Sequence, residues 1–354
     1  MQNEDIYCIG VMSGTSLDGL DLAYVRFNTN NYTDFDIIEV ETVPYSKKWL
    51  TDLKEAIHYS DTILADLDIA YGKYIGTKIV EFIDKYAIQK IDFIASHGHT
   101  VLHQPQKGIT LQIGNGQEIS NITSHKVVCD FRTQDVKLGG QGAPLVPIGD
   151  KLLFANYDYC VNLGGFSNVS YQQNSERIAF DICPVNTVLN HYCRKIGLEY
   201  DDEGRIASEG KINHTLLKAL NDLSFYRKSP PKSLGLEWVQ STIFPLIDDI
   251  EKDISTILRT FIEHIAVQIS KVIERKNTVL FTGGGTFNSF LIERIEFLTK
   301  KRVAIPSNTL INYKEALIFG FLGLLKLKDE INCLQSVTGA SKNHSSGKVF
   351  YPEK

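Results

Sequence analysis

Short apolar runs separated by polar turns open the chain. Residues 6–11 are apolar enough for a buried strand, and residues 21–26 alternate polar and apolar side chains as a second strand would. Residues 35–42 continue the pattern as a third strand, which would complete an antiparallel meander. Apolar side chains then recur at helical spacing over residues 49–59 and 63–86. The pattern predicts a β-meander followed by helices.

The next part of the chain alternates short apolar runs with polar ones. Residues 91–95 predict a buried strand that ends on the polar run 96–100, and in an α/β sheet ligands collect at strand ends. Further short strands are predicted at 110–113 and 126–129. Three glycines and two prolines within residues 139–147 then predict a sharply bent connector. We expect the domain boundary here, between residues 144 and 145, with a helix over 145–154.

The second half opens like the first. Residues 159–163 predict a strand, Gly164 and Gly165 begin a tight loop, and residues 169–171 return as a second strand. The other predicted elements are a strand over 177–181, a helix through residue 196 with Asn186 as its N-cap, a helix over 254–276, a strand over 278–281, a helix from near residue 288 and a helix over 314–327. The tail 336–354 is rich in Ser, Gly and Lys, so we expect it to be loose.

Composition narrows the class of protein. A chain of 354 residues suits two domains, 1–144 and 145–313, and we expect the helix at 314–330 to pack back on the first. A net charge of −5 argues against a nucleic-acid binder. The six cysteines form no Cys-x-x-Cys pair, which favours reduced, buried thiols of a cytoplasmic protein. No signal-peptide pattern opens the chain, and the most apolar helix, 316–325, is too short to cross a bilayer.

The loop between the first two predicted strands has the chemistry of a phosphate site. It contains two glycines, Ser13, Thr15, Ser16 and the carboxylate of Asp18. A tight loop of this kind exposes successive backbone N–H groups, and such a nest suits phosphate oxygens. The loop lacks the Gly-Lys-Ser/Thr ending of a P-loop and the Gly-x-Gly-x-x-Gly layout of a dinucleotide fold.

A strand–loop–strand phosphate hairpin instead favours the actin, sugar kinase and Hsp70 superfamily, with Asp18 near the Mg²⁺ of a nucleotide triphosphate. The alternative is an ordinary β-hairpin with a polar turn.

Two further glycine loops strengthen the first interpretation. The Gly164-Gly165 loop repeats the strand–loop–strand unit about 150 residues after the first one. Gly283, Gly284 and Gly285 lie between a predicted strand and a predicted helix, where glycine lets the backbone approach a ligand closely. Two phosphate-type hairpins and a third glycine loop predict a nucleotide clamp between two domains, each a mixed sheet flanked by helices.

Motifs along the whole chain also occur together in one known family. In order they are Gly14-Thr15-Ser16-Leu17-Asp18-Gly19, Ser96-His97-Gly98, Thr110-Leu111-Gln112-Ile113-Gly114, Asp130-Phe131-Arg132, Gly139-Gly140-Gln141-Gly142-Ala143-Pro144-Leu145, Asn162-Leu163-Gly164-Gly165, Phe180-Asp181, Pro230-Pro231-Lys232-Ser233 and Gly283-Gly284-Gly285. With them the chain resembles a divergent member of the anhydro-N-acetylmuramic acid kinases of bacterial cell-wall recycling.

The resemblance implies a two-domain kinase, usually a homodimer, that uses ATP and Mg²⁺. It implies hydrolysis of the 1,6-anhydro ring of 1,6-anhydro-N-acetylmuramic acid coupled to phosphorylation of O6, which gives N-acetylmuramic acid 6-phosphate and ADP. A water must attack the anomeric carbon while O6 leaves and takes the γ-phosphoryl group. That reaction needs a carboxylate as general base, and backbone amides with Mg²⁺ to hold the triphosphate in line.

The resemblance also implies roles for particular residues. By its position after Phe180, Asp181 is the expected base. Nucleotide contacts are expected from Ser13, Gly14, Thr15, Ser16, Leu17, Asp18, Gly19 and Leu20 and from Gly164, Gly165, Gly283, Gly284 and Gly285, with Asp18 also near the metal. Sugar contacts are expected from His97, Gly98, Arg132, Asp135, Asn186 and Glu315. A guanidinium such as that of Arg132 suits a bidentate grip on the lactyl carboxylate.

Each of these side chains has a simpler use as well. Asp181 could cap the helix that follows it. His97 could be a core histidine with its hydrogen bonds satisfied. Asp135 could belong to a surface ion pair or a turn, and Glu315 could be a first-turn charge that interacts favourably with the helix dipole.

Three departures from the family pattern fall near the expected sugar pocket. Cys183 and Val185 replace glycines in the run after the base, His99 replaces a glutamine, and Leu236 replaces an arginine. Side chains then occupy positions where the backbone could otherwise pass close to a ligand. Two alternatives therefore stay open: a kinase for another anhydro- or amino-sugar, and a nucleotide-binding regulatory protein with impaired catalysis.

Overall fold

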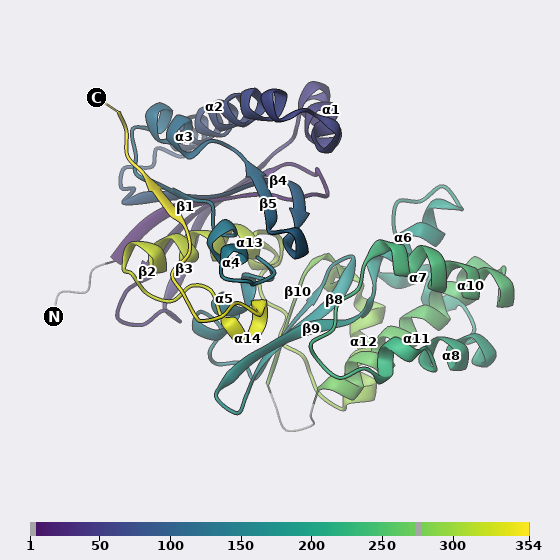
Figure 1. The fold of residues 1–354 in the computed structure, drawn as a ribbon. Coiled ribbons are helices and arrows are strands. Elements are labelled where there is room, and N and C mark those ends of the chain that lie inside the picture. The colour runs from purple at the N-terminus through teal and green to yellow at the C-terminus, as the bar shows by residue number, and fades with distance from the viewer. Residues whose placement is uncertain (1–4, 274–277, 354) are drawn as a thin grey trace. The chain divides into compact units, whose positions relative to one another are not determined.

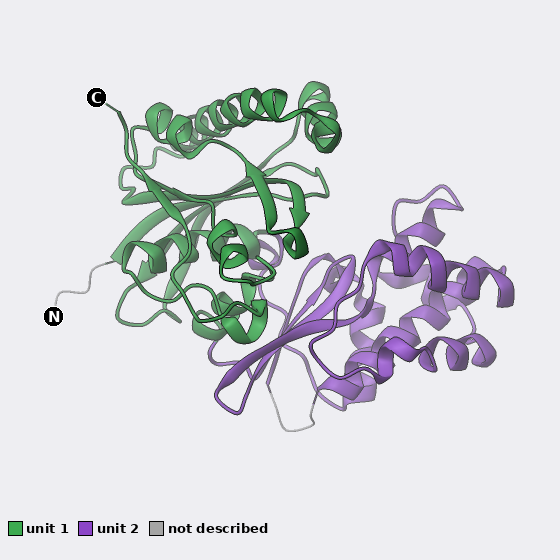
Figure 2. Cartoon of the chain, in the orientation of Figure 1, with its two compact units in different colours: residues 1–154, 313–354 green, residues 155–312 purple. Residues whose placement is uncertain are grey.

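The chain folds into two compact units. The computed structural model describes residues 5–273 and 278–353. Unit 1 comprises residues 1–154 and 313–354, and unit 2 comprises residues 155–312 (Figure 2). The first boundary therefore lies between Phe154 and Ala155, after the helix that we expected to open the second domain. The second boundary falls within one continuous helix, α13 (Asn308–Leu327).

Unit 1 is built on a seven-stranded mixed sheet with the order β11-β6-β4-β1-β2-β3, and β5 pairs with β4. Its strands are β1 (Asp5–Ser13), β2 (Leu20–Asn28), β3 (Phe35–Val43), β4 (Phe93–Gln104), β5 (Ile109–Ile113), β6 (Val127–Cys129) and β11 (Lys348–Phe350). The first three form the predicted antiparallel meander, and β4 runs parallel to β1. The central strands are therefore paired on both edges, which suits their apolar composition.

Helices cover both faces of this sheet (Figure 1). On one face, Ile9 of β1 packs in a buried cluster with Tyr71 and Ile75 of α2 (Asp61–Lys85). On the other face lies α13, and a Cβ added to Gly10 would overlap the carbonyl oxygen of Ala316. Glycine at position 10 is what lets the helix backbone approach the strand this closely. The other helices of unit 1 are α1 (Lys47–Glu55), α3 (Gly116–Thr123), α4 (Thr133–Lys137), α5 (Val146–Leu152) and α14 (Gln335–Thr338).

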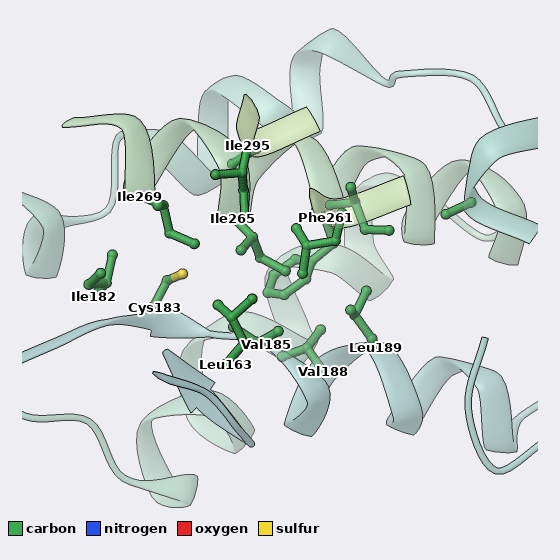
Figure 3. Close-up of a cluster of buried hydrophobic side chains, with 14 of the residues drawn as sticks. Leu163, Ile182, Cys183, Val185, Val188, Leu189, Phe261, Ile265, Ile269 and Ile295 are labelled. Atoms are coloured by element: carbon green, nitrogen blue, oxygen red, sulfur yellow. The ribbon is translucent and has the colours of Figure 1, made fainter. Parts of the chain in front are cut away.

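Unit 2 has a four-stranded sheet with the order β10-β7-β8-β9. Its strands are β7 (Tyr159–Leu163), β8 (Phe166–Gln173), β9 (Glu176–Pro184) and β10 (Val279–Thr282). Its helices are α6 (Asn186–Arg194), α7 (Arg205–Glu209), α8 (His214–Asn221), α9 (Leu236–Trp238), α10 (Phe244–Ile250), α11 (Ile254–Val272) and α12 (Ser289–Thr299). Side chains from α11, such as Phe261 and Ile265, meet Leu163, Val188 and Ile295 in one buried cluster (Figure 3).

Several predicted boundaries need correction. The strand predicted at 91–95 continues as β4 through the polar run to Gln104, because β5 hydrogen-bonds to its second half. Helix α13 begins at Asn308, so Glu315 is not in its first turn. Asn186 is the first residue of α6 and not its N-cap; Val185 holds that position, without a side-chain cap. The predicted helix over 254–276 ends at Val272, and positions 274–276 lie outside the described residues.

The prediction of a loose C-terminal tail is wrong. Strand β11 pairs antiparallel with β6, and the Lys348 ammonium lies 2.7 Å from the Asp130 carboxylate. Ser346 is fully buried, and its hydroxyl donates to the carbonyl oxygen of Phe131 over 2.7 Å. Long-range contacts of this kind override a polar composition, so the tail is an integral part of unit 1.

The cysteines lie in the interior of the two units. All six cysteines are buried and none forms a disulfide. Within residues 5–273 and 278–353, no helix is long and apolar enough to cross a membrane.

Candidate active site

The loop between β1 and β2 forms the predicted tight turn. The backbone N–H of Leu17 donates to the carbonyl oxygen of Gly14 over 3.2 Å, and Leu17 has a left-handed conformation with φ of 62°. Thr15, Ser16 and Asp18 are exposed at its tip. Two hydroxyl groups are thus available as donors to a phosphate, and the carboxylate of Asp18 is available to a cation.

Ser13 differs from the other hydroxyl residues of this stretch, because it is 1% exposed. The Tyr71 hydroxyl donates to Ser13 Oγ over 2.8 Å, and Ser13 Oγ also hydrogen-bonds to the Tyr45 hydroxyl at 2.8 Å and to His99 Nδ1 at 3.1 Å. Its side chain therefore ties the base of the loop to α2 and β4. His99, which we expected to alter the sugar pocket, is 4% exposed and belongs to this buried network.

Asp21, at the start of β2, is a carboxylate that the sequence analysis did not single out. Its Oδ1 accepts a hydrogen bond from the Thr42 hydroxyl at 2.6 Å. Desolvation raises the pKa of Asp21 above its usual value, and the charge of Asp18 adds to this effect. Two carboxylates thus stand beside the same loop. The signal in the sequence was the Asp-x-x-Asp spacing across the end of the loop.

Arg132 and His97 form a polar pair that several hydrogen bonds hold in place. The His97 Nδ1 lies 2.8 Å from the Gly98 carbonyl oxygen, which can only accept, so Nδ1 carries the proton. Its Nε2 accepts from the Arg132 Nε at 3.0 Å and from Nη2 at 2.9 Å, and Arg132 Nη1 donates to the Gly142 carbonyl oxygen at 2.6 Å. Burial, reinforced by the charge of Arg132, holds the pKa of His97 well below its usual range. His97 is therefore a neutral acceptor that fixes the guanidinium.

Glu315 and Asp135 flank this arginine in different ways. Glu315 is exposed on α13 and near enough to Arg132 for their charges to interact. Asp135 has no exposed surface; its Oδ2 accepts from the Gly142 N–H at 2.7 Å and its Oδ1 from the Thr338 hydroxyl at 2.7 Å. Asp135 thus holds the connector after Arg132 against the C-terminal segment. Both simpler uses of Asp135 are wrong, because its burial excludes a surface ion pair and its position in α4 (Thr133–Lys137) excludes a turn.

A pocket of about 320 Å³ lies beside His97 in unit 1. Its wall includes His97, Gly98 and the whole run from Thr110 to Gly114, together with Asp130. Gly98 has φ of 71°, and a Cβ there would crowd the Ile113 carbonyl oxygen, so glycine is required where β4 passes β5. The lining is mostly polar, as a pocket for a hydroxylated ligand would be.

The glycine loops of unit 2 meet at the carboxyl ends of two neighbouring strands. Strands β7 and β10 are parallel, with Thr282 beside Asn162. A Cβ on Gly283 or Gly285 would crowd the Leu163 carbonyl oxygen, so only glycine allows the two loops to lie together. Asn186 lies next to this group, because its N–H donates to the Gly164 carbonyl oxygen at 3.2 Å. Within unit 2, the structure therefore brings together the Gly164-Gly165 loop, the loop of residues 283–285 and Asn186.

Asp181 lies in β9, directly before a bulge that leaves Ile182 without a partner on β8. Its N–H donates to the Lys232 carbonyl oxygen at 3.1 Å, and its Oδ2 accepts from the Leu234 N–H at 2.8 Å. Within the described part of the chain, no hydrogen bond involves its other oxygen, Oδ1. The alternative use of Asp181 as a helix cap is wrong, because α6 begins at Asn186.

Desolvation raises the pKa of Asp181 above its usual value, and the Leu234 N–H opposes this effect. A carboxylate with a raised pKa is a better proton acceptor while it still ionises near neutrality. One oxygen is thus held by the backbone and the other is left for a proton. This arrangement suits a general base.

The substituted positions near Asp181 do not intrude on a pocket. Cys183 and Val185 have no exposed surface and point into the core of unit 2, next to Val188, Leu189 and Ile269 (Figure 3). Their side chains replace core volume rather than ligand space. The expectation that they change the sugar pocket is therefore wrong.

Comparison with known proteins agrees with the motifs. Residues 6–352 match the family model described as anhydro-N-acetylmuramic acid kinase. The chain is 34% identical over 366 residues to the anhydro-N-acetylmuramic acid kinase of Shewanella loihica, covering 97% of this chain and 98% of the relative. It is 30% identical over 364 residues to that of Hydrogenovibrio crunogenus, covering 97% and 98%.

Among solved structures, the activator of the 2-hydroxyisocaproyl-CoA dehydratase from Clostridium difficile with bound ADPNP matches with a TM-score of 0.43 and 12% identity, covering 91% of this chain and 97% of that chain. The family model spans nearly the whole chain, and relatives at 30% identity or more share its full length. The chain belongs to the anhydro-N-acetylmuramic acid kinase family.

Proposed function

We propose that the protein is an ATP-dependent kinase for 1,6-anhydro-N-acetylmuramic acid. It would open the 1,6-anhydro ring with water and phosphorylate O6, giving N-acetylmuramic acid 6-phosphate and ADP. Family membership supports the activity, and one observation carries the chemistry: Asp181 has one oxygen anchored and a raised pKa. With this product, the protein would act in peptidoglycan recycling.

Asp181 is the general base of the proposed reaction. Its Oδ1 accepts a proton from a water as the water oxygen bonds to the anomeric carbon C1. The C1–O6 bond breaks, O6 bonds to the γ-phosphorus, and the bond from that phosphorus to the bridging oxygen of ADP breaks. The Leu234 N–H holds Oδ2, so the carboxylate presents a fixed oxygen to the water.

Nucleotide binding is assigned to the loops. Exposed Thr15 and Ser16 and the amides around them would bind phosphate oxygens, as would the glycine loops of unit 2. Asp18 and Asp21 supply the carboxylate oxygens that Mg²⁺ prefers, so these residues fit the metal. Bound Mg²⁺ would neutralise charge on the transferring phosphoryl group. Ser13, with its hydroxyl in an interior network, would position the loop rather than contact ATP.

The sugar contacts follow from the hydrogen bonds of Arg132. Three of its five N–H donors are used by His97 and Gly142, which leaves two for the lactyl carboxylate. Asp135 would support this arginine through Gly142, whose N–H donates to Asp135 and whose carbonyl oxygen accepts from Arg132. Gly98, Asn186 and Glu315 remain proposed sugar contacts. We also propose a homodimer in the cytoplasm, where ATP is available.

The experiment that tests the activity compares Asp181→Asn with a matched control. Glu176→Gln, at the exposed start of the same strand β9, removes one carboxylate charge away from the site. Coupled ADP release with 1,6-anhydro-N-acetylmuramic acid should fall at least about 10³-fold in Asp181→Asn and stay at the wild-type rate in Glu176→Gln. ATP affinity should be unchanged in both.

Two outcomes would count against the proposal. Wild-type turnover in Asp181→Asn would show that Asp181 is not the general base. ATP binding by the wild-type protein with no turnover of this sugar would favour another amino-sugar or the regulatory alternative.

A further inference from the structure

A buried group of three metal-ligating side chains lies behind Arg132 and outside the proposed reaction. Asp135 comes from α4, and Cys333 and His344 come from the C-terminal segment. They are 0%, 2% and 5% exposed. One carboxylate oxygen, the thiol sulfur and one imidazole nitrogen all lie within 4.8 Å of one another. Among residues 5–273 and 278–353, no other group of three His, Cys, Asp or Glu side chains converges in this way.

The hydrogen bonds of His344 fix which of its nitrogens faces the group. Nδ1 lies 3.1 Å from the Lys342 carbonyl oxygen, which can only accept, so Nδ1 carries a proton. Nε2 is buried, forms no hydrogen bond within the described residues, and lies 3.5 Å from Asp135 Oδ1. In the neutral imidazole, a lone pair would therefore face a carboxylate. Two buried acceptors in this arrangement require a cation between them, either a proton or a metal ion.

The distance and the third side chain favour a metal ion over a proton. A charge-assisted N–H···O bond is typically about 2.7–2.9 Å long, shorter than the 3.5 Å between Nε2 and Oδ1. Two ligands bonded at about 2.0–2.1 Å to one tetrahedral ion lie about 3.3 Å apart. The Cys333 thiol completes a mixed sulfur, nitrogen and oxygen set, which is typical of Zn²⁺ sites.

The surroundings of the group already orient its ligands. The Thr338 hydroxyl donates to Asp135 Oδ1 at 2.7 Å, and the Gly142 N–H donates to Oδ2 at 2.7 Å. The Lys342 carbonyl oxygen holds the far nitrogen of His344. Metal-bound imidazoles and carboxylates characteristically have such outer hydrogen bonds, which fix the tautomer and the direction of the lone pair.

We propose that Asp135, Cys333 and His344 bind a structural Zn²⁺ ion that fastens the C-terminal segment to α4. Three protein ligands leave one coordination position for a water or a nearby hydroxyl. Binding converts the thiol to a thiolate, and the proton goes to solvent. Because α4 begins directly after Arg132, the ion would also steady that arginine. This inference is independent of the proposed activity and of Mg²⁺ at the nucleotide loop.

Cobalt substitution tests the proposal on the intact protein. Wild-type protein stripped with a chelator should bind one Co²⁺ per chain and develop the strong near-ultraviolet absorption of a thiolate–cobalt bond, which Zn²⁺ abolishes and Mg²⁺ does not. Zn²⁺ should also raise the melting temperature of the stripped protein by about 3 °C or more.

Variants identify the ligands. Cys333→Ser should lose the thiolate absorption, and His344→Gln should raise the Co²⁺ dissociation constant at least about 100-fold. Cys129→Ser is the matched control, because Cys129 is a buried thiol of the same unit outside the group, and it should keep both signals.

If the two ligand variants fail to fold, the Co²⁺ titration of the wild-type protein still tests whether the site binds a metal ion. Stripped wild-type protein with no thiolate–cobalt absorption and no zinc-dependent melting shift would overturn the site and leave a protonated His344 paired with Asp135. Retained absorption in a folded Cys333→Ser variant would equally overturn it.

Discussion

Lys232 is expected to control the base through the loop that carries it. Its ammonium lies 4.8 Å from the ring centroid of Phe225 and 5.5 Å from that of Phe180, the residue before Asp181. The same loop holds the Asp181 carboxylate through the Leu234 N–H. The Lys232 backbone carbonyl also accepts from the Asp181 N–H, so removing the ammonium should loosen the loop on β9 rather than detach it, and should weaken the Leu234 hydrogen bond to the base.

The contacts of Lys232 and Leu234 indicate how far kcat should fall. Two cation–π contacts contribute about 1–3 kcal/mol together, and a hydrogen bond to a carboxylate contributes about 1.5–3 kcal/mol. If Lys232→Met loses the hydrogen bond in the reacting complex, kcat should fall about 10- to 100-fold. Lys232→Arg keeps a cation near both rings and should lose less.

The pH profile separates this effect from simple destabilisation. The Leu234 N–H lowers the pKa of Asp181, so its loss should raise that pKa further. Because the base must be ionised, the acid limb of kcat should move to higher pH in Lys232→Met. Steady-state ADP release between pH 5 and 9 measures the shift, with exposed Lys228→Met as the matched control. A Lys232→Met profile that matches the Lys228→Met profile in rate and position would refute the reasoning.

Three further predictions concern other parts of the chain. Gly10→Ala should lower the melting temperature by several degrees, since its Cβ would overlap the Ala316 carbonyl oxygen; an unchanged melting curve would contradict the packing of α13 on β1. Burial lowers the pKa of His264 to about 3, so the unfolded state binds the proton first and the free energy of unfolding should decrease as pH falls below about 6.5. Urea titrations at pH 7.5 and 5.0 should show a smaller decrease in His264→Gln, and an equal one would exclude this histidine as a source. Arg132→Lys should raise the KM for the sugar at least about tenfold, because a lysine cannot both bond His97 and grip a carboxylate with two donors; an unchanged KM would exclude the proposed contact.

The local chemistry of the loops could be predicted from the sequence. The run from Ser13 to Leu20 forms the expected tight turn, and Gly164 and Gly283 lie together because their strands are parallel neighbours. Glycines and polar residues at strand ends indicate the local backbone conformation. That conformation depends on only a few neighbouring residues, so it can be predicted from the sequence. Asp181 could likewise be assigned to a strand, and the resemblance implied the role that we propose for it.

The features that could not be predicted depend on contacts between distant parts of the chain. The nucleotide contact of Ser13 stays a prediction, but the sequence did not show that Tyr45, Tyr71 and His99, from three distant positions, bind its hydroxyl. Cys183 seemed to enter the pocket because its sequence position says nothing about which face of a strand packs on the core. The tail looked loose because its partners, such as Phe131, lie some 215 positions away.

The mass of the reaction product tests the central claim most directly. Wild-type protein incubated with ATP, Mg²⁺ and 1,6-anhydro-N-acetylmuramic acid should release ADP and a sugar heavier than the substrate by one phosphoryl group plus one water. That result requires both the attack of water at C1, for which Asp181 is the proposed base, and the transfer of the phosphoryl group to O6. A sugar heavier by a phosphoryl group alone, with the anhydro ring intact, would contradict the account.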